Sequence, residues 1–245
     1  MFMSGHSKWH NIQGKKGKAD QIRSGLFTKF ARAITVAASQ GGNDPDMNFT
    51  LRLAIEKAKE INMPKDNIER AIKRGTGELN DGAVLEEAMY EGFGPGGATF
   101  LVEVVTDNRT RTVSEIKNIF SKNSGSAGGP GSVKWQYKNL GVLRFAKEAK
   151  DKLGDKWPEV ELALIESGLE DIEENEYGIE LFCPIVNFKK MMETIKAYNI
   201  VLEEFGLEWV AKEKVNLNED ESKKAEALYN ALDEMDDVKA AYVNF

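Results

Sequence analysis

The sequence predicts an α+β protein: an N-terminal helical domain followed by two ferredoxin-like α/β domains, one inserted in the other. Three observations lead to this prediction: helical periodicity over residues 20–75, a strand–helix–strand pattern on each side of a long insertion, and a second set of the same elements inside it. Repeated β-α-β units of this kind are typical of the ferredoxin-like fold. The predicted limits are 1–19 for a flexible basic arm, 20–78 for the helical domain, 79–141 plus 209–245 for the split domain, and 142–208 for the inserted acidic domain.

Helical periodicity defines the first domain. Apolar residues recur at three- and four-residue steps, which places them on one face of a helix: Ile22, Leu26, Phe30, Ala33, Ile34 and Ala37. The Gly41-Gly42 pair ends this helix. Pro45 predicts the start of a second helix, and Pro64 predicts the start of a third, which Gly75 ends. These apolar stripes are expected to form a core and need no further function.

Strand patterns follow the helical region. Residues 98–106, ATFLVEVVT, read as a buried strand, and a helix, a glycine-rich loop and a strand at 133–137 come next. The end of the chain repeats this order, with a strand at 207–217, a helix at 219–233 and a strand at 238–243. Inside the insertion, the predicted elements are a strand at 142–145, a helix from Pro158, a hairpin at 170–182 with its turn near 176–178, a helix at 187–198 and a strand at 200–205.

Charge is unevenly distributed along a chain whose formal net charge is −7. Residues 1–75 carry 14 Lys and Arg against 7 Asp and Glu, a net charge of +7, whereas residues 76–245 carry 19 against 33, a net charge of −14. The inserted region 142–208 alone has 8 basic and 16 acidic residues, which argues against direct contact with phosphates. A basic head on an acidic body indicates a head that meets a polyanion; a charge separation that only solubilises the protein would give the same composition.

Composition excludes several classes of protein. Hydrophobic residues make up 41% of the chain and charged residues 30%, which suits a soluble globular protein. No apolar run approaches the roughly 20 residues that cross a bilayer, and no apolar segment follows the N-terminal basic residues as it would in a signal peptide. The single cysteine, Cys183, excludes an internal disulfide and makes a cysteine-built metal site implausible. We therefore expect a cytoplasmic protein.

Two glycine-rich segments resemble phosphate-binding loops but lack the required context. GFGPGG at 92–97 has the glycine spacing of a dinucleotide-binding motif, yet a strand follows it where that motif needs a helix. A turn that demands positive φ is the preferred interpretation. The loop at 125–131 lacks the Gly-Lys-Ser/Thr ending of a P-loop, so a mobile surface loop is expected, and a contact with a nucleic-acid backbone stays open.

Residues suited to catalysis or metal binding are few. His6 and His10 have the i, i+4 spacing of paired ligands on a helix, but Ser7 stands where a metalloprotease motif has Glu, and no third ligand is evident. Two histidines and one cysteine also leave little material for a catalytic triad. The sequence predicts no cofactor, no metal and no enzymatic activity.

The segment TDNRTRT, residues 106–112, lies where a predicted strand ends and a helix begins. Arg109 and Arg111 would therefore stand beside the free backbone N–H groups of a helix N-terminus, which is a phosphate-binding arrangement. The alternative is local: Asp107 or Thr110 caps the helix, and the arginines pair with surface carboxylates.

The N-terminal stretch GHSKWHNIQGKKGKAD, residues 5–20, combines lysines, glycines and one tryptophan. Such a segment cannot bury a core, and it fits an arm that follows a nucleic-acid backbone while Trp9 stacks on a base. Alternatively, Trp9 only docks the arm on the helical domain.

Several long blocks resemble, in order, the signature segments of the YebC/PmpR family. They are GHSKWHNIQGKKGKAD, FTKFARAI, LRLAIEKAKEINMPKDNIERAIKRGTGE, YEGFGPGG, TDNRTRTVSEIKNIFSKN and GSVKWQY, and the match extends to the terminal DDVKAAYVNF. The resemblance implies a helical N-terminal domain with two α/β domains. It also implies a role as a probable transcriptional regulator that binds DNA; mitochondrial relatives are described as activators of translation, and bacterial members have been linked to the ribosome and to relief of stalling. Thr110 departs from the family pattern, in which many members have Asn.

These observations lead to a non-enzymatic, nucleic-acid-binding regulator of gene expression that contacts DNA through a basic N-terminal face. One alternative is a ribosome-associated translation factor that binds ribosomal or transfer RNA and relieves stalling; a more distant one is an enzyme acting on a phosphorylated small molecule. The expected partner is DNA or RNA, with the ribosome as a further candidate, and not a membrane. The candidate nucleic-acid contacts are Lys8, Trp9, Lys15, Lys16, Lys18, Arg23, Lys29, Arg32, Arg109 and Arg111.

Overall fold

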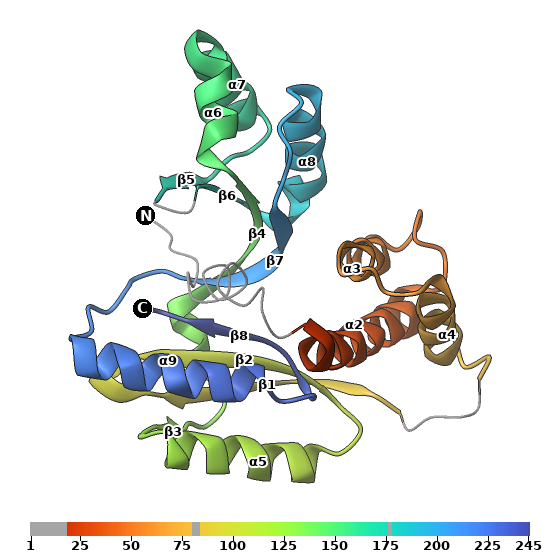
Figure 1. Ribbon diagram of the computed structural model, residues 1–245, viewed down its shortest axis with the longest axis vertical. Coiled ribbons are helices and arrows are strands. Elements are labelled where there is room, and N and C mark those ends of the chain that lie inside the picture. The colour runs from red at the N-terminus through yellow and green to blue at the C-terminus, as the bar shows by residue number, and fades with distance from the viewer. Residues whose placement is uncertain (1–18, 80–83, 176–177) are drawn as a thin grey trace. The chain divides into compact units, whose positions relative to one another are not determined.

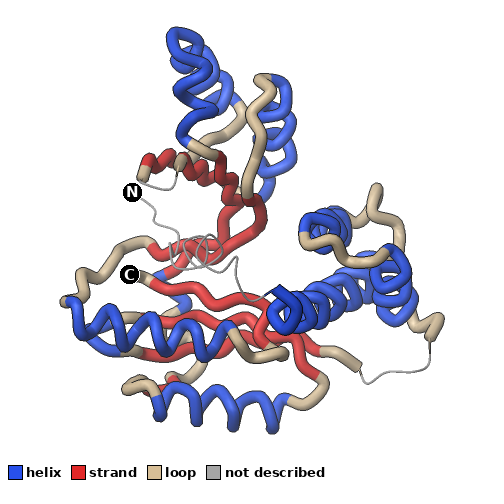
Figure 2. The backbone as a smooth tube through the Cα atoms, viewed as in Figure 1, coloured by secondary structure: helices blue, strands red, loops and turns tan. Residues whose placement is uncertain are grey.

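The computed structural model describes residues 19–79, 84–175 and 178–245, with side chains described from residue 25 onward (Figure 1). The described residues divide into two compact units. The outer unit comprises residues 19–134 and 216–241, and the inserted unit comprises residues 135–215 and 242–245. Helices come first and two antiparallel sheets with helices follow (Figure 2), so the predicted α+β class is confirmed.

Three helices begin the outer unit: α2 (Ala19–Gly41), α3 (Phe49–Glu60) and α4 (Lys65–Gly75). Their apolar faces form one core, whose buried members include Ile34, Leu51 and Ile68. The glycine signals at the ends of α2 and α4 are confirmed, because these helices end at Gly41 and Gly75. The expected start of the second helix at Pro45 is wrong. A turn occupies residues 45–47, and α3 begins after Asn48, whose side-chain oxygen accepts a hydrogen bond from the N–H of Leu51 at 3.1 Å.

Gly75 also has a packing role. A Cβ atom built on Gly75 would lie 2.2 Å from the backbone oxygen of Thr35 in α2. No side chain fits at that separation, so glycine both ends α4 and lets the two helices approach closely.

The outer sheet has the strand order β3-β1-β2-β8. Its strands are β1 (Glu86–Phe93), β2 (Thr99–Thr106), the short β3 (Ser126–Ala127) and β8 (Val238–Val243). The expected strand at 98–106 is confirmed as β2, but β1 went unrecognised. It pairs with β2 along its whole length, from Glu86 opposite Thr106 to Phe93 opposite Thr99. Its Glu and Ala residues are weak strand formers, so pairing with β2, and not local preference, makes this segment a strand.

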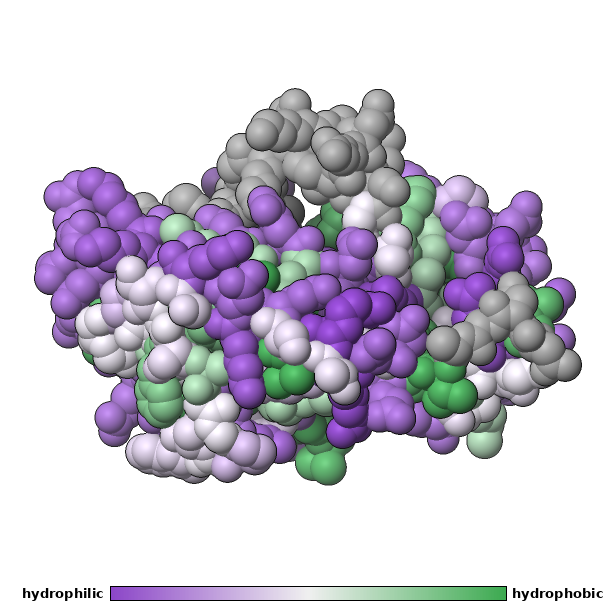
Figure 3. Space-filling model, turned by 90° about the horizontal axis from the view of Figure 1, so that it is seen from below, coloured by the Kyte–Doolittle hydropathy of each residue, from purple (hydrophilic) through white to green (hydrophobic). Residues whose placement is uncertain are grey.

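Two helices pack together against this sheet: α5 (Arg109–Lys122) and α9 (Glu219–Asp233). Phe120 of α5 meets Phe100 of β2 edge to face, with ring centroids 5.7 Å apart. Leu228 and Leu232 of α9 are fully buried. The side of the molecule seen in Figure 3 shows hydrophilic residues over most of the described surface, with hydrophobic ones in small separate areas.

The inserted unit has the strand order β5-β6-β4-β7, which is that of a ferredoxin-like sheet. Its elements are β4 (Tyr137–Phe145), α6 (Lys147–Leu153), α7 (Trp157–Glu166), β5 (Asp171–Glu174), β6 (Ile179–Cys183), α8 (Phe188–Ala197) and β7 (Glu204–Ala211). The outer sheet has the same spatial order, except that its β1 comes before β2 in the chain instead of after the first helix. The two sheets therefore have the same spatial arrangement of strands, but the chain begins it at a different strand in each unit.

The structure corrects the elements at both ends of the insertion. Most of the strand expected at 133–137 is a 3₁₀ turn, η2 (Lys134–Gln136), and only Tyr137 is in a strand. That strand, β4, runs on without a break through the strand expected at 142–145. The strands expected at 200–205 and 207–217 meet in one shorter strand, β7, and residues 200–203 and 212–217 lie outside it. Because β4 and β7 pair from Tyr137–Ala211 to Arg144–Glu204, the compact unit extends beyond the predicted limits of 142–208. Short apolar stretches could not reveal that each pair of segments is one strand.

Charged residues form a buried cluster in the inserted unit. Arg144 is 3% exposed and donates to Glu180 at 2.8 Å and to both oxygens of Glu208 at 2.8 and 2.9 Å. Glu173 faces Glu180 across β5 and β6 and is itself buried, with an oxygen, Oε1, that has no hydrogen-bond partner among the described residues. Burial, above all, raises the pKa of Glu173 to about 7.

Candidate nucleic-acid interface

The predicted contacts fall into two groups. Five lie outside the described residues: Lys8, Trp9, Lys15, Lys16 and Lys18. Arg23 belongs to α2, and the other four have described side chains in the outer unit: Lys29, Arg32, Arg109 and Arg111.

Asp237 brings two of the predicted arginines together. This residue lies just before β8, and its side chain is 6% exposed. One carboxylate oxygen accepts a hydrogen bond from Arg32 of α2, and the other accepts from Arg111 of α5 at 2.8 Å. The carboxylate therefore links the first helix of the outer unit to its sheet and to α5.

Two threonines complete this ion cluster. Thr112 donates to the carboxylate of Asp237 at 2.6 Å and Thr106 at 3.1 Å, while their own hydroxyls lie 2.8 Å apart. Burial of Asp237 acts to raise its pKa, but the hydrogen bonds from Thr112, Arg111 and Arg32 outweigh burial and hold the pKa at about 2. Asp237 is consequently a fixed negative charge at neutral pH.

Lys29 also binds the last residue of α9, and Arg32 binds the turn that follows this helix. The ammonium of Lys29 donates to the backbone oxygen of Asp233, the last residue of α9, and Arg32 donates to that of Asp236 at 2.8 Å. Cations are favoured at a helix C-terminus, where carbonyl groups lack helical partners. Both side chains are only partly exposed, at 14% for Lys29 and 22% for Arg32. Much of their charge is thus directed into the protein.

Arg109 is the most exposed of the four. Its side chain is 60% exposed and pairs with Glu86 of β1 at 2.6 Å. The segment does join β2 to α5, as expected, but the cap differs from both candidates: Asn108 accepts the N–H of Arg111 at 3.0 Å. Arg111 is 43% exposed and also pairs with Asp107 at 2.9 Å.

A carboxylate fixes the glycine-rich loop that precedes β4. Glu91, which is buried, accepts hydrogen bonds from the backbone N–H groups of Gly131 at 2.5 Å, Val133 at 2.6 Å and Lys134 at 2.8 Å. Burial raises the pKa of Glu91, but these three donors together outweigh it, so that the net pKa is lowered. The loop therefore presents an anion-binding set of N–H groups whose anion is part of the protein, and the expectation of a mobile loop finds no support.

The glycine motif at 92–97 is a turn. It connects β1 to β2, and Gly96 and Gly97 have φ of 65° and 84°. The interpretation as a turn demanding positive φ is confirmed, because a non-glycine residue rarely adopts this backbone conformation.

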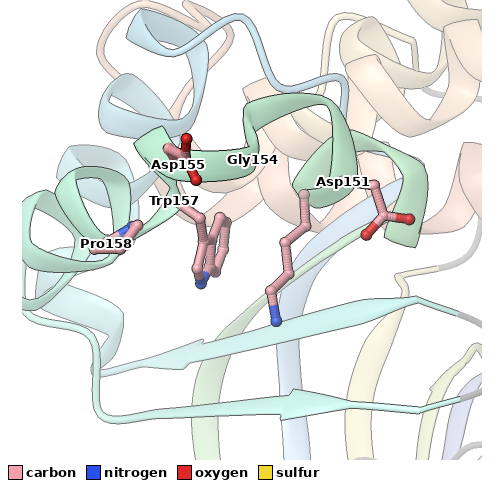
Figure 4. A pocket seen from close by; sticks show the side chains of 6 residues that line it. Asp151, Gly154, Asp155, Trp157 and Pro158 are labelled. Atoms are coloured by element: carbon pink, nitrogen blue, oxygen red, sulfur yellow. The ribbon is translucent and has the colours of Figure 1, made fainter.

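The described residues offer little for small-molecule or metal chemistry. An open depression in the inserted unit is lined by Lys150, Asp151, Gly154, Asp155, Trp157 and Pro158 (Figure 4). The ammonium of Lys150 lies 5.3 Å from the centre of the Trp157 ring and donates to Glu174 at 2.6 Å, so it is held by protein groups. Within the described residues, no three His, Cys, Asp or Glu side chains are grouped to hold a metal ion; His6 and His10 lie outside them. In the same part of the chain, no helix has the length and apolar character that crossing a membrane requires.

Comparison with protein-family models covers nearly the whole chain. Residues 7–78 match the model described as TACO1/YebC protein N-terminal domain, and residues 85–245 match the model described as TACO1/YebC second and third domain. The chain belongs to the TACO1/YebC family. The resemblance seen in the sequence is confirmed.

Individual TACO1/YebC relatives extend this result. The probable transcriptional regulatory protein FN1661 of Fusobacterium nucleatum is 44% identical over 244 residues, which is 99% of this chain and 96% of the relative. A probable transcriptional regulatory protein of Geotalea uraniireducens is 46% identical over 247 residues, with 99% and 96% coverage. The crystal structure of a conserved hypothetical protein, Aq1575 from Aquifex aeolicus, matches with a TM-score of 0.82 and 38% identity over 94% of this chain and 93% of that one.

Two organising residues of this TACO1/YebC protein were missed from the sequence. Asp237 lies in an acidic stretch, DEMDD, that reads as solvated surface, and Glu91 lies in a strand that was not recognised. The available signals were weak: a cluster of threonines around TDNRTRT for Asp237, and a loop of glycines that needs an acceptor for Glu91. In both cases the partners lie far apart in the chain.

Proposed function

We propose that the protein is a non-enzymatic, nucleic-acid-binding regulator of gene expression that acts on transcription by binding DNA through its basic N-terminal face. The observation that carries the proposal is the charge of residues 1–75, a net +7 against −14 for the rest of the chain. A polyanion gains from contact with the first region and is repelled by the second. The names of relatives that are 44% and 46% identical, probable transcriptional regulatory proteins, support the same role.

The described arginines contribute unequally to this role. Arg109 supports phosphate contact best, since it is 60% exposed and its partner Glu86 is also largely exposed, at 54%. An exposed ion pair of this kind is held by about 0–1 kcal/mol, so a phosphate can replace the carboxylate. Arg32 is held by buried Asp237, and we assign it to placing α2 more than to binding phosphate.

The main alternative keeps the charged surface and changes the target. A translation factor that binds ribosomal or transfer RNA and relieves stalling would use the same cations, because phosphates supply most of the binding energy in both cases. An enzyme acting on a phosphorylated small molecule has less support, since the described depression at Trp157 has its lysine engaged by Glu174.

Equilibrium binding at several salt concentrations tests the proposal. The full chain is titrated with a DNA duplex of mixed sequence and with a hairpin RNA, beside a variant in which Lys15, Lys16 and Lys18 are changed to Gln. The matched control changes Lys223 and Lys224 of α9, which pair with Glu219 and Asp220 along the same helix. We expect the arm variant to bind more weakly and with a shallower salt dependence, because fewer counterions are released, and the control to bind like the parent.

The outcomes separate the candidates. Tighter binding to the duplex supports the transcriptional role, and tighter binding to the hairpin RNA supports the translational one. Equal salt slopes for the arm variant and the parent would contradict the assignment of binding to the N-terminal face.

A further inference from the structure

Trp135 is an exposed tryptophan of the inserted unit and belongs to the 3₁₀ turn η2, which precedes β4. It is 67% exposed, whereas the other two described tryptophans, Trp157 and Trp209, are only partly so. Indole is the largest side chain that a protein can leave in water, and single exposed apolar residues are common enough to need no explanation by themselves. The backbone contacts and the lysine next to Trp135 distinguish it from a chance exposed residue.

The backbone is held on both sides of Trp135. On the N-terminal side, the N–H of Lys134 donates to the buried carboxylate of Glu91 at 2.8 Å. On the C-terminal side, the N–H of Lys212 donates to the backbone oxygen of Gln136 at 2.9 Å and extends the β4–β7 ladder by one bond. The indole thus projects from an ordered support, which lowers the conformational entropy lost when a ligand stacks on it.

A cation is bound at the backbone of Trp135. The ammonium of Lys212 donates to the backbone oxygen of Trp135 at 2.6 Å. An ammonium has three N–H donors, so this bond leaves donors for an anion. Lys134, the preceding residue in the chain, is exposed as well.

We infer that Trp135 and Lys212 form a stacking site for an unpaired base of single-stranded nucleic acid. The base lies on the indole face, and the phosphate beside it contacts the Lys212 ammonium. Aromatic stacking together with a neighbouring cation is the usual means of binding single strands, and it requires a base that is free of its own neighbours. The inference rests on the proposed function. It adds a contact region that is separate from the predicted arm and from Arg109. This region also lies outside residues 142–208, for which no phosphate contact was expected.

The test uses the full chain and two probes: a fluorescein-labelled twelve-nucleotide oligo(dT) and a duplex of mixed sequence. The variants are Trp135→Ala, Trp135→Phe and Lys212→Ala, with Lys196→Ala as the control, because Lys196 is also an exposed lysine of the inserted unit. We expect Trp135→Ala to weaken oligo(dT) binding about tenfold, with duplex binding unchanged within about twofold. Trp135→Phe should lose less, because it keeps an aromatic face, and Lys212→Ala should reduce the salt dependence.

Photocrosslinking gives a reading on the unaltered protein, which keeps the test decisive if Trp135→Ala fails to fold. Oligonucleotides with 5-bromouracil are irradiated with the parent chain, and the crosslinked peptide is identified by mass spectrometry. A crosslink at Trp135 supports the inference. Crosslinks only elsewhere, or equal oligo(dT) binding by a folded Trp135→Ala, would overturn it while leaving the proposed function intact. A parent chain that binds neither probe overturns both.

Discussion

Arg32 donates a hydrogen bond to the buried carboxylate of Asp237, which lies 205 positions further along the chain. The same carboxylate also accepts hydrogen bonds from Arg111, Thr106 and Thr112. Most of the donors of this cluster come from two consecutive elements, β2 and α5, and Arg32 alone comes from the first helices. Loss of the carboxylate should therefore weaken both the attachment of α2 and the junction between β2 and α5.

Replacement of Asp237 by Asn should lower the free energy of unfolding by about 1.5–3 kcal/mol, the usual range for hydrogen bonds to a charged group. The amide keeps the size of the carboxylate but removes its charge and one acceptor. Urea unfolding of the variant measures the effect. Asp236→Asn is the control, since that side chain is exposed and the adjacent backbone is the same. Equal losses in the two variants would show that the carboxylate of Asp237 has no special role.

Acid should remove the advantage of Asp237. Its pKa is about 2 in the folded protein, below the ordinary value of 3.8, so the folded state binds the proton less tightly than the unfolded chain. The contribution to stability is complete above the unfolded pKa and is lost as the pH falls from about 4 toward 2. Unfolding experiments at pH 7, 4 and 3 should show the stability difference between the parent and Asp237→Asn shrinking; a constant difference would contradict the assignment.

Glu173 should have the opposite pH dependence. Burial raises its pKa to about 7 from an ordinary 4.5, so its ionisation opposes folding as the pH rises between these values. Glu173→Gln should stabilise the protein at pH 8 by about 1–2 kcal/mol, after allowance for partial screening by solvent, and have little effect at pH 5. Thermal melts at both pH values measure this, with Glu193→Gln on exposed surface as the control.

Glu91→Gln should loosen the glycine-rich loop. An amide has one acceptor oxygen, whereas both carboxylate oxygens accept bonds from the loop in the parent. We expect a loss of about 1–3 kcal/mol and faster hydrogen exchange at Gly131, Val133 and Lys134. Exchange measured by NMR locates the effect. Unchanged protection at these three amides would mean that the loop is fixed by other contacts.

Arg109 and Arg111 should respond differently to replacement by Ala. Arg109 pairs with exposed Glu86, so its loss should cost about 0–1 kcal/mol and lower affinity for unrelated nucleic-acid sequences alike. Arg111 binds Asp237, so its replacement should lower the melting temperature more than that of Arg109 does. Melting curves beside titrations with several DNA and RNA oligomers distinguish the two. A loss confined to one sequence would instead indicate base readout.

The inserted unit should fold alone when its strands are complete. A fragment of residues 135–215 contains all of β4 and β7, whereas residues 142–208 cut both strands. We expect cooperative thermal unfolding for the longer fragment and none for the shorter one, because the β4–β7 pairing is lost at both ends. Circular dichroism of the two fragments provides the comparison, and cooperative unfolding of 142–208 would contradict it.

Local sequence patterns predicted the helical domain correctly. They failed for strands whose existence or length depends on pairing with another strand. Apolar periodicity and terminal glycines were sufficient for α2 and α4, because both are local properties. β1 was missed because a strand with three Glu residues among eight is stabilised by its neighbours β2 and β3 and not by local preference. The lengths of β4 and β7 were missed for the same reason, since each extends only as far as its partner.

The sequence was sufficient to predict which charged residues the candidate interface contains. It was not sufficient to predict which partners those residues bind. The charge of the N-terminal region and the position of Arg109 at a helix start are visible in the sequence. The partner of Arg32 is not, because an acidic residue 205 positions away cannot be distinguished from any other surface carboxylate. Burial is what separates Asp237 from exposed Asp236, and burial depends on the assembled core.

The separation of Arg32 and Asp237 along the chain also sets the order in which the ribosome makes them. A ribosome adds about 5–20 residues per second, so Asp237 is made roughly 10–40 s after Arg32, 205 positions earlier. The core of α2, α3 and α4 is local and is complete once Ala71 has been made. A nascent chain thus has an interval in which its first helices can be folded while Lys29 and Arg32 still lack their acidic partners. During that interval the two cations are accessible to anions other than Asp237.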